Sequence, residues 1–250
     1  MIPFPLVTAH TGCMGTPDNS VESARTALAL GADIIEDDIR VTRDGVLVLS
    51  HDDRVVLADG RLASLSKLTL QELNEGLAVP LVRLESVIEL LVGGDAGTRM
   101  NLDLKTDDCI EPVAAFIRER DIEDRIFLTG CEYARAVRAN ERARGLAKLL
   151  NVNVDSFRTS VYVEAAKTAC EEAASAGCFG LNVPYQLVLP ELLEIASDRG
   201  LSVYVWTVRE PEAMTRYARM GVRSITTRDV ETLLRVKQHW PDEENSGNDL

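Results

Sequence analysis

The sequence predicts a closed parallel (β/α)8 barrel, for two reasons. Strand-like and helix-like segments alternate in close to eight units along the chain. The chain has 250 residues, of which 46% are hydrophobic and only 5% aromatic. This length and composition suit one domain whose core is built from Ala, Val, Leu and Ile by repeated packing of helices on strands. The alternative fold with the same alternation is a doubly wound open sheet.

The N-terminal segments predict a strand, a helix and a strand hairpin. A short strand is expected at 6–9 and is followed by a glycine-rich loop. Asn19 or Ser20 then caps a helix at 21–30, because both side chains can accept a hydrogen bond from a free backbone N–H group. Two strands within 34–50 enclose an Asp-Gly turn, since this pair tolerates positive φ.

Residues 54–80 interrupt the alternation with an irregular pattern. A turn is expected at 58–60, and Thr69 with Glu72 forms the capping box that begins a helix. We therefore expect a small insertion after the second barrel strand.

The alternation is regular in the remainder of the chain. Helices are expected near 84–92, 108–120, 132–144, 160–176, 190–199, 211–220 and 228–239. Strands are expected at 99–105, 125–128, 147–150, 179–182, 201–206 and 224–226. Residues 1–239 are thus expected to form a single domain, followed by an acidic tail at 240–250 that is expected to be disordered.

Charge and composition exclude several partners. The net charge is −13, and the basic residues are scattered, so we expect no nucleic-acid binding. No leader sequence is recognisable and no apolar stretch approaches the roughly 20 residues that span a bilayer, so we expect no stable membrane insertion. The five cysteines are odd in number and lack metal-site spacing, which indicates reduced thiols and a cytoplasmic location.

Acidic residues are placed toward the ends of two predicted strands. Glu36 and Asp38 alternate with apolar residues, so they share one strand face, as do Asp103 and Lys105 on the strand at 99–105. Neighbouring carboxylates repel each other unless a cation lies between them. An all-oxygen ligand set suits Mg2+ or Ca2+ better than zinc, and Lys105 would then contact a phosphate. The alternatives are a solvated strand end and a simple ion pair between Asp103 and Lys105.

Two histidines follow strand-like segments. His10 ends the first strand, and His51 follows the second run of the hairpin. Because the carboxyl ends of parallel barrel strands meet at one mouth, both rings are expected near the acidic cluster. Imidazole titrates near neutral pH, so the pair suits general base and general acid roles toward a metal-bound anion.

Three other residues are weighed as site candidates. Trp206 closes the strand at 201–206 and is either a packing residue or an aromatic wall for a substrate alcohol. Asn182 closes the strand at 179–182 and is a candidate polar contact. Cys13 lies near the first histidine but has no base of its own, so we interpret it as a packing residue and not as a nucleophile.

Several segments resemble the glycerophosphodiester phosphodiesterase family, in order from about residue 6 to 235. They are Ala9-His10-Thr11-Gly12, Pro17-Asp18-Asn19-Ser20, Gly31 to Asp38, Thr42 to Asp52, Asn101 to Lys105, Val205 to Val208 and Gly221-Val222. The resemblance implies a TIM barrel and metal-dependent cleavage of a small-molecule phosphodiester into an alcohol and a glycerol phosphate. It also implies the roles of the site residues: His10 and His51 as the acid-base pair, and Glu36, Asp38 and Asp103 as metal ligands.

The sequence departs from this family at the phosphate contact. Family members carry Arg after the first histidine, where this chain has Thr11, whose hydroxyl lacks the charge and reach of a guanidinium fork. Arg209, in the loop after the strand at 201–206, is a candidate to restore the charge; the alternative is a solvated arginine. Asp18 and Asp103 are each one methylene shorter than the Glu that is usual in the family.

Three other functions remain as alternatives. The pair Asp103 and Lys105 also resembles the spider-venom-type phospholipases D, which form cyclic phosphates by internal attack of a substrate hydroxyl. A second alternative is a barrel that binds a phosphorylated ligand without turnover, with Thr11 marking a lost phosphate contact. A sugar-phosphate isomerase or aldolase on the same fold would need a Schiff-base lysine, for which only Lys105 is placed.

Overall fold

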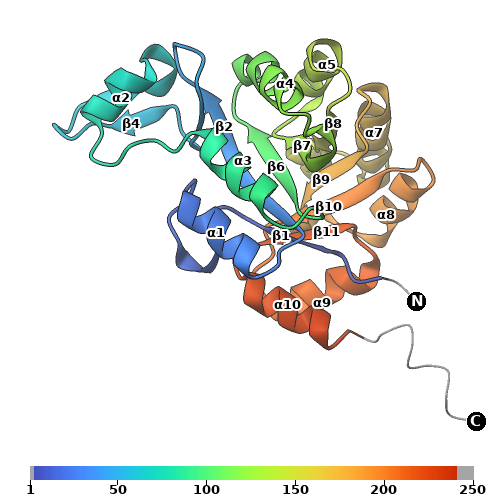
Figure 1. Ribbon diagram of the computed structural model, residues 1–250. Coiled ribbons are helices and arrows are strands. Elements are labelled where there is room, and N and C mark those ends of the chain that lie inside the picture. The colour runs from blue at the N-terminus through green and yellow to red at the C-terminus, as the bar shows by residue number, and fades with distance from the viewer. Residues whose placement is uncertain (1–2, 241–250) are drawn as a thin grey trace, which may run out of the picture.

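The computed structural model describes residues 3–240 and shows a closed barrel of parallel strands surrounded by helices (Figure 1). The order around the barrel is β1-β2-β6-β7-β8-β9-β10-β11, and β1 closes it by pairing with both β2 and β11. The strands are β1 (Leu6–Ala9), β2 (Ile34–Val41), β6 (Arg99–Leu104), β7 (Ile126–Thr129), β8 (Ala147–Asn151), β9 (Gly180–Pro184), β10 (Ser202–Trp206) and β11 (Ser224–Thr227). The predicted barrel is therefore confirmed, and the open-sheet alternative is wrong.

Helices cover the outside of the barrel (Figure 1). They are α1 (Val21–Ala29), α3 (Leu84–Gly93), α4 (Ile110–Glu119), α5 (Tyr133–Arg142), α7 (Tyr162–Ser175), α8 (Pro190–Ser197), α9 (Pro211–Met220) and α10 (Val230–Gln238). Short 3-10 turns occur at Cys13–Gly15, Leu65–Lys67, Asp107–Cys109, Glu123–Arg125 and Tyr185–Leu187. The extra helix α6 (Val154–Thr159) was not predicted; the Asn153 side chain caps it by accepting hydrogen bonds from two backbone N–H groups.

The two polar residues before α1 have separate tasks. Ser20 is the cap, because its hydroxyl oxygen accepts a hydrogen bond from the Ser23 backbone N–H at 3.0 Å. Asn19 instead adopts a positive φ of 54°, a conformation that asparagine tolerates better than most residues. Its side chain exchanges two hydrogen bonds with Asp38 of β2, each 3.0 Å long. The loop after β1 is therefore tied to the acidic strand.

The insertion after the second barrel strand is confirmed, and it projects from one side of the barrel (Figure 1). It comprises β3 (Leu47–Leu49), which pairs antiparallel with β2, the hairpin β4 (Arg54–Val56) and β5 (Leu62–Ser64), and α2 (Leu70–Gly76). The predicted capping box of Thr69 and Glu72 begins α2. Val48, Leu65 and Leu73 are fully buried in a small core of the insertion's own.

The barrel interior has an apolar layer below a polar one. Ile34, Phe127, Leu149 and Tyr204 form a buried cluster contributed by four strands. Because strand side chains alternate, the residues two positions further along these strands face the same interior, closer to the carboxyl ends. Those residues are Glu36, Thr129, Asn151 and Trp206. The apolar layer thus forms the floor of a polar mouth.

All of these elements lie between Leu6 and Gln238, within the predicted domain of residues 1–239. Of the tail expected to be disordered, residues 241–250 lie outside the described part of the chain. Within residues 3–240, no helix combines the length and the apolar character that crossing a bilayer requires.

Candidate active site

A cleft of about 240 Å3 opens at the carboxyl ends of the barrel strands. Every barrel strand, or the residue directly after it, contributes to its lining: His10, Glu36, Asp103, Thr129, Asn151, Asn182, Trp206 and Thr226. This is the end of the barrel at which enzymes of this architecture carry their catalytic residues.

Three carboxylates converge in the cleft from two adjacent strands. In the parallel pairing of β2 with β6, Asp38 lies opposite Asp103, and Glu36 precedes Asp38 by two residues on the same face. One carboxylate oxygen of each residue lies within 4.8 Å of the others. Glu36 is 6% exposed and Asp38 is 5% exposed, so water screens their repulsion poorly.

Lys105 lies between two of these carboxylates. Its ammonium nitrogen is 2.6 Å from Oδ1 of Asp38 and 2.7 Å from Oδ2 of Asp103. Burial acts to lower the pKa of Lys105, but the charges of Asp103 and Asp38 outweigh burial and raise it, which keeps the side chain protonated. The ion pair weighed as an alternative from the sequence is present, and it extends to a second carboxylate.

Lys105 does not neutralise all three carboxylates, and the negative charge that is left suits a divalent cation. Burial, and then the charges of Asp38 and Asp103, raise the pKa of Glu36 well above its usual range. Within residues 3–240, no donor reaches the buried Oδ1 atom of Asp103. A buried acceptor without a partner costs about 1–3 kcal/mol, and carboxylate oxygens are the ligands that hard cations prefer. This buried acidic cluster could therefore hold a divalent metal ion.

His10 is positioned as a neutral imidazole. Its Nδ1 atom is 2.8 Å from the Thr11 carbonyl oxygen, which can only accept, so Nδ1 carries the proton and Nε2 keeps a free lone pair. Nδ1 also lies 3.8 Å from the Glu36 carboxylate. Burial lowers the pKa of His10, which favours the uncharged ring.

His51 lies at the exposed rim of the same cleft. Its side chain is 68% exposed, and Nδ1 is 2.9 Å from Oδ1 of Asp52. The hydrogen bond from His51 lowers the pKa of the Asp52 carboxyl group. Arg40 holds the backbone here, since two of its guanidinium nitrogens donate to the His51 carbonyl at 2.8 and 3.0 Å.

Thr11 lines the cleft, but its hydroxyl group is engaged elsewhere. The hydroxyl donates to Oδ1 of Asp37 at 2.7 Å and accepts from the Asn19 backbone N–H at 2.6 Å. The Thr11 backbone N–H donates to Glu36 at 3.1 Å. Burial raises the pKa of Asp37 to about 7. Thr11 therefore supports the loop that orients the acidic strand.

The cleft includes some residues that sequence reasoning missed and leaves out one that it named. Trp206 and Asn182 line the cleft, whereas Arg209 is exposed and does not line it. The residues not anticipated are Asn101, Thr129, Asn151, Thr226 and Arg228. The first four share the inward face near a strand end, so extending the period of two to every strand would have found them. Arg228 follows the last strand and carries no such signal.

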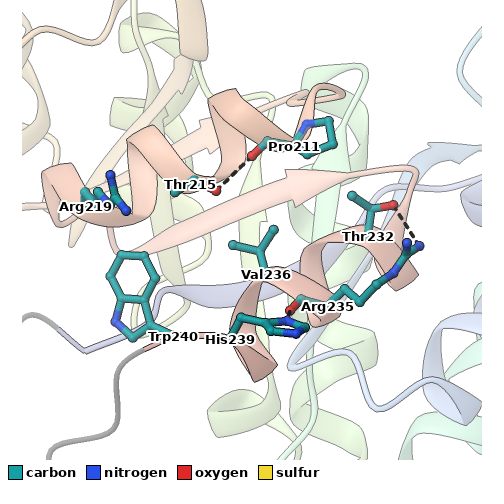
Figure 2. A pocket seen from close by; sticks show the side chains of 8 residues that line it. All are labelled: Pro211, Thr215, Arg219, Thr232, Arg235, Val236, His239 and Trp240. Atoms are coloured by element: carbon teal, nitrogen blue, oxygen red, sulfur yellow. Dashed lines mark hydrogen bonds between the residues drawn. The ribbon is translucent and has the colours of Figure 1, made fainter.

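A second hollow, of about 490 Å3, lies between α9 and α10 on the outside of the barrel. Figure 2 shows its lining, in which Val236 and Trp240 lie beside Arg219 and Arg235. His239 lies here, with its Nδ1 atom 2.7 Å from the Arg235 carbonyl oxygen. No lining residue within the described chain is acidic, so the mouth of the barrel is the candidate active site.

The fold and the site together define a class of protein, a (β/α)8 barrel with an acidic, histidine-flanked cleft at the strand ends. The chain belongs to the glycerophosphoryl diester phosphodiesterase family, whose model matches residues 10–232. The family suggested by the sequence motifs is thereby confirmed.

Individual relatives cover nearly the whole chain. A glycerophosphodiester phosphodiesterase of Caldanaerobacter subterraneus subsp. tengcongensis is 27% identical in an alignment that covers 92% of this chain and 97% of the relative. The glycerophosphodiester phosphodiesterase of Thermotoga maritima superposes with a TM-score of 0.75 at 22% identity, covering 93% of this chain and 98% of that structure. An Oleispira antarctica phosphodiesterase in complex with sn-glycerol-3-phosphate gives a TM-score of 0.74 at 19% identity, covering 94% and 97%.

Proposed function

We propose that this protein is a metal-dependent glycerophosphodiester phosphodiesterase, which cleaves a small-molecule phosphodiester into an alcohol and a glycerol phosphate. The observation that carries the proposal is the meeting of two histidines, three carboxylates and Lys105 in one cleft. Membership of the family supports it, as does the product sn-glycerol-3-phosphate bound to the Oleispira antarctica relative.

The acidic cluster is proposed to hold the metal. Glu36, Asp38 and Asp103 would be the protein ligands of Mg2+ or Ca2+. A bound divalent ion supplies positive charge that stabilises the phosphate as negative charge builds up. Lys105 would contact a phosphate oxygen, while Trp206 and Asn182 would line the side of the cleft that receives the alcohol.

The two histidines are proposed to move the protons of the hydrolysis. Nε2 of His10 takes a proton from water as the water oxygen bonds to phosphorus. The bond from phosphorus to the alcohol oxygen breaks, and His51 gives its proton to that oxygen. The hydrogen bond between His51 and Asp52 supports the second role, because a carboxylate stabilises the imidazolium that donates.

A cyclising reaction is the second candidate, because the pair of Asp103 and Lys105, which meets Asp38 in the cleft, resembles the spider-venom-type phospholipases D. In that route a hydroxyl of the substrate replaces water as the nucleophile, and the product is a cyclic phosphate. The third candidate is a barrel that binds a phosphorylated ligand without turnover.

One assay separates these three candidates. Purified protein is incubated with a panel of glycerophosphodiesters and lysophospholipids in Mg2+, Ca2+ or chelator, and phosphorus NMR identifies the products. We expect a glycerol phosphate monoester that disappears with chelator and with His10→Asn. A cyclic phosphate would identify the cyclising route, and binding without any product would contradict the enzyme proposal.

A cytoplasmic location and a role in lipid and glycerol metabolism belong to the same proposal. The five cysteines are free thiols and all are buried, which suits a reducing compartment. Fractionation of cells that express the chain with a C-terminal tag tests the location.

A further inference from the structure

The cleft has few positive charges with which to receive an anionic substrate. Its lining includes four carboxylates, those of Asp18, Glu36, Asp38 and Asp103. Among the described lining residues, the side chains with a permanent positive charge are Lys105 and Arg228. Two of the carboxylates already engage Lys105. Arg228 is therefore the cation in the cleft that the acidic cluster does not neutralise.

Barrel closure places Arg228 beside the loop that follows β1 and begins with His10. In the parallel pairing of β1 with β11, Ala9 lies opposite Thr227, so the next residues, His10 and Arg228, leave the barrel side by side. The His10 backbone N–H donates to the Thr227 carbonyl at 2.9 Å. The Met14 backbone N–H donates to the Arg228 carbonyl at 2.8 Å. The backbone of Thr227 and Arg228 is thus bonded to His10 and Met14 of the loop that follows β1.

The guanidinium group lies directly over the backbone of that loop. Nη1 of Arg228 pairs with Oδ1 of Asp18 at 2.5 Å. A Cβ atom added to Gly12 would lie 2.3 Å from this Nη1 and 1.9 Å from Oδ1 of Asp18. Gly12, two residues after His10, therefore leaves room for the pair, and its positive φ of 71° also suits glycine.

The other donors of Arg228 remain available. Within residues 3–240, Asp18 is the side chain that Arg228 bonds, through Nη1, and Nε and Nη2 donate to no protein atom. The side chain is 40% exposed and lines the cleft. A guanidinium held at one corner by a carboxylate presents its other N–H groups in a fixed fork, which matches two oxygens of a phosphate.

We propose that Arg228 is the phosphate clamp of this chain, binding the non-bridging phosphate oxygens with Asp18 as its holder. The proposal rests on the proposed phosphodiesterase function. It also accounts for Thr11, whose hydroxyl supports Asp37 and Asn19 while a residue from the other end of the chain supplies the positive charge.

The test measures phosphate affinity separately from turnover. Inhibition or calorimetry with inorganic phosphate is compared for wild type, Arg228→Gln, Arg228→Lys and Asp18→Asn, together with KM and kcat for glycerophosphodiesters. Arg228→Gln should weaken phosphate binding and raise KM by about 10- to 100-fold, since a hydrogen bond to a charged group contributes roughly that factor. Arg228→Lys should recover part of the loss, because lysine keeps the charge without the fork.

Asp18→Asn separates phosphate binding from a purely structural ion pair. If Arg228 binds phosphate, Asp18→Asn leaves the phosphate affinity unchanged or increases it, because the asparagine Oδ1 atom can still accept the bond that holds the guanidinium while the competing negative charge is removed. If the ion pair only holds the loop in place, Asp18→Asn and Arg228→Gln cause the same loss of phosphate affinity, and this result overturns the proposal. If Arg209→Ala loses phosphate affinity and Arg228→Gln does not, the proposal is overturned in favour of Arg209. Arg25→Gln, at an exposed position on α1, controls for the change in net charge.

Failure of the clamp can be told apart from failure of the function. If the wild type hydrolyses the panel and Arg228→Gln has the same KM and phosphate affinity as the wild type, only the proposed role of Arg228 is overturned. If the wild type hydrolyses nothing, the phosphodiesterase function is overturned. The phosphate affinities of wild type and Arg228→Gln then still test whether Arg228 binds phosphate. Thermal unfolding of each variant verifies that it is folded. If Arg228→Gln does not fold, the phosphate affinity and KM of Arg228→Lys are compared with wild type instead.

Discussion

At the scale of single residues, Lys105 stabilises the acidic cluster. Its ammonium group contacts both Asp38 and Asp103 while its side chain is only 16% exposed. Removing one partner of a buried charge cluster is costly because the other charges stay buried without compensation.

We therefore predict that Lys105→Ala destabilises the protein by about 3–5 kcal/mol in chelator and by less in Mg2+, which would supply the missing positive charge. Urea unfolding in both conditions measures the difference. Lys167→Ala, which breaks an exposed pair with Glu164 on α7, is the control and should cost about 0.5 kcal/mol or less. An equal loss for Lys105→Ala in chelator and in Mg2+ would contradict this interpretation.

His51 allows catalysis to be separated from stability, because its imidazole is exposed and bonds only the neighbouring Asp52 side chain among the described residues. His51→Asn should lower kcat about 100- to 10,000-fold, the usual contribution of a general acid. The free energy of unfolding should change by less than about 0.5 kcal/mol. His239→Asn, in the outer hollow, is the matched control and should leave kcat unchanged. Comparable kcat values for the two variants would rule out the proposed role of His51.

At the scale of secondary-structure elements, α5 anchors the loop that follows the acidic strand β6. Arg135 of α5 donates to Asp107 at 2.7 Å, and also to the carbonyl oxygens of Leu104 and Gly130. Arg138 pairs with the same carboxylate at 2.5 Å. The hydrogen bond from Arg135 lowers the pKa of Asp107.

We predict that Asp107→Asn destabilises the protein at pH 7 by about 1 kcal/mol, a small value because the carboxylate is 37% exposed and partly screened. Since the folded-state pKa is the lower one, this contribution is present above the unfolded pKa of about 3.9 and is lost as pH falls through the folded pKa. Urea unfolding at pH 7 and pH 3 should show a smaller difference in the free energy of unfolding between wild type and variant at pH 3, which lies below the unfolded pKa. A gap of equal size at both pH values would show that the charge of Asp107 is not responsible.

At the scale of the whole molecule, the acidic cluster couples metal binding to the stability of the barrel. Its ligands come from β2 and β6, which are separated in the chain by the insertion and α3, so the site exists only when these two strands pair in the folded barrel. An ion that binds the folded state alone stabilises that state by mass action.

We predict that Mg2+ or Ca2+ at 100 times its Kd stabilises the protein by about 2.7 kcal/mol, which raises Tm by about 5–10 °C for a chain of this length. Glu36→Gln should abolish this shift, because it removes one ligand oxygen charge, while Glu164→Gln on the surface of α7 should keep it. Calorimetry with and without chelator measures Tm. A full shift in Glu36→Gln would exclude Glu36 as a ligand.

Local periodicity predicted much of the fold and part of the cleft. The alternation of side chains in β2 and β6 placed Glu36, Asp38 and Asp103 on inward faces, and the structure has them within 4.8 Å of one another. The capping box of α2 was predicted from Thr69 and Glu72 because its hydrogen bonds span only three residues. The roles of Glu36, Asp38 and Asp103 as metal ligands, and those of the two histidines in catalysis, remain predictions.

Other elements gave too weak a local pattern. The β4 and β5 strands are three residues each and partly exposed, so no apolar alternation marks them. The helix α6 is six residues long and depends on the side chain of Asn153 for its cap. Such short segments gain their stability from neighbouring structure and not from their own sequence.

What the sequence alone determined is therefore the order of the strands and helices and the face on which each carboxylate lies, since both follow from contacts between residues a few positions apart. What only the tertiary structure decided is which side chain from the far end of the chain lies beside His10. The register of β1 against β11 brings Arg228 to that position, whereas Arg209, in the loop after β10, lies outside the cleft. That register is set by closing the whole barrel, a long-range condition that no local pattern records.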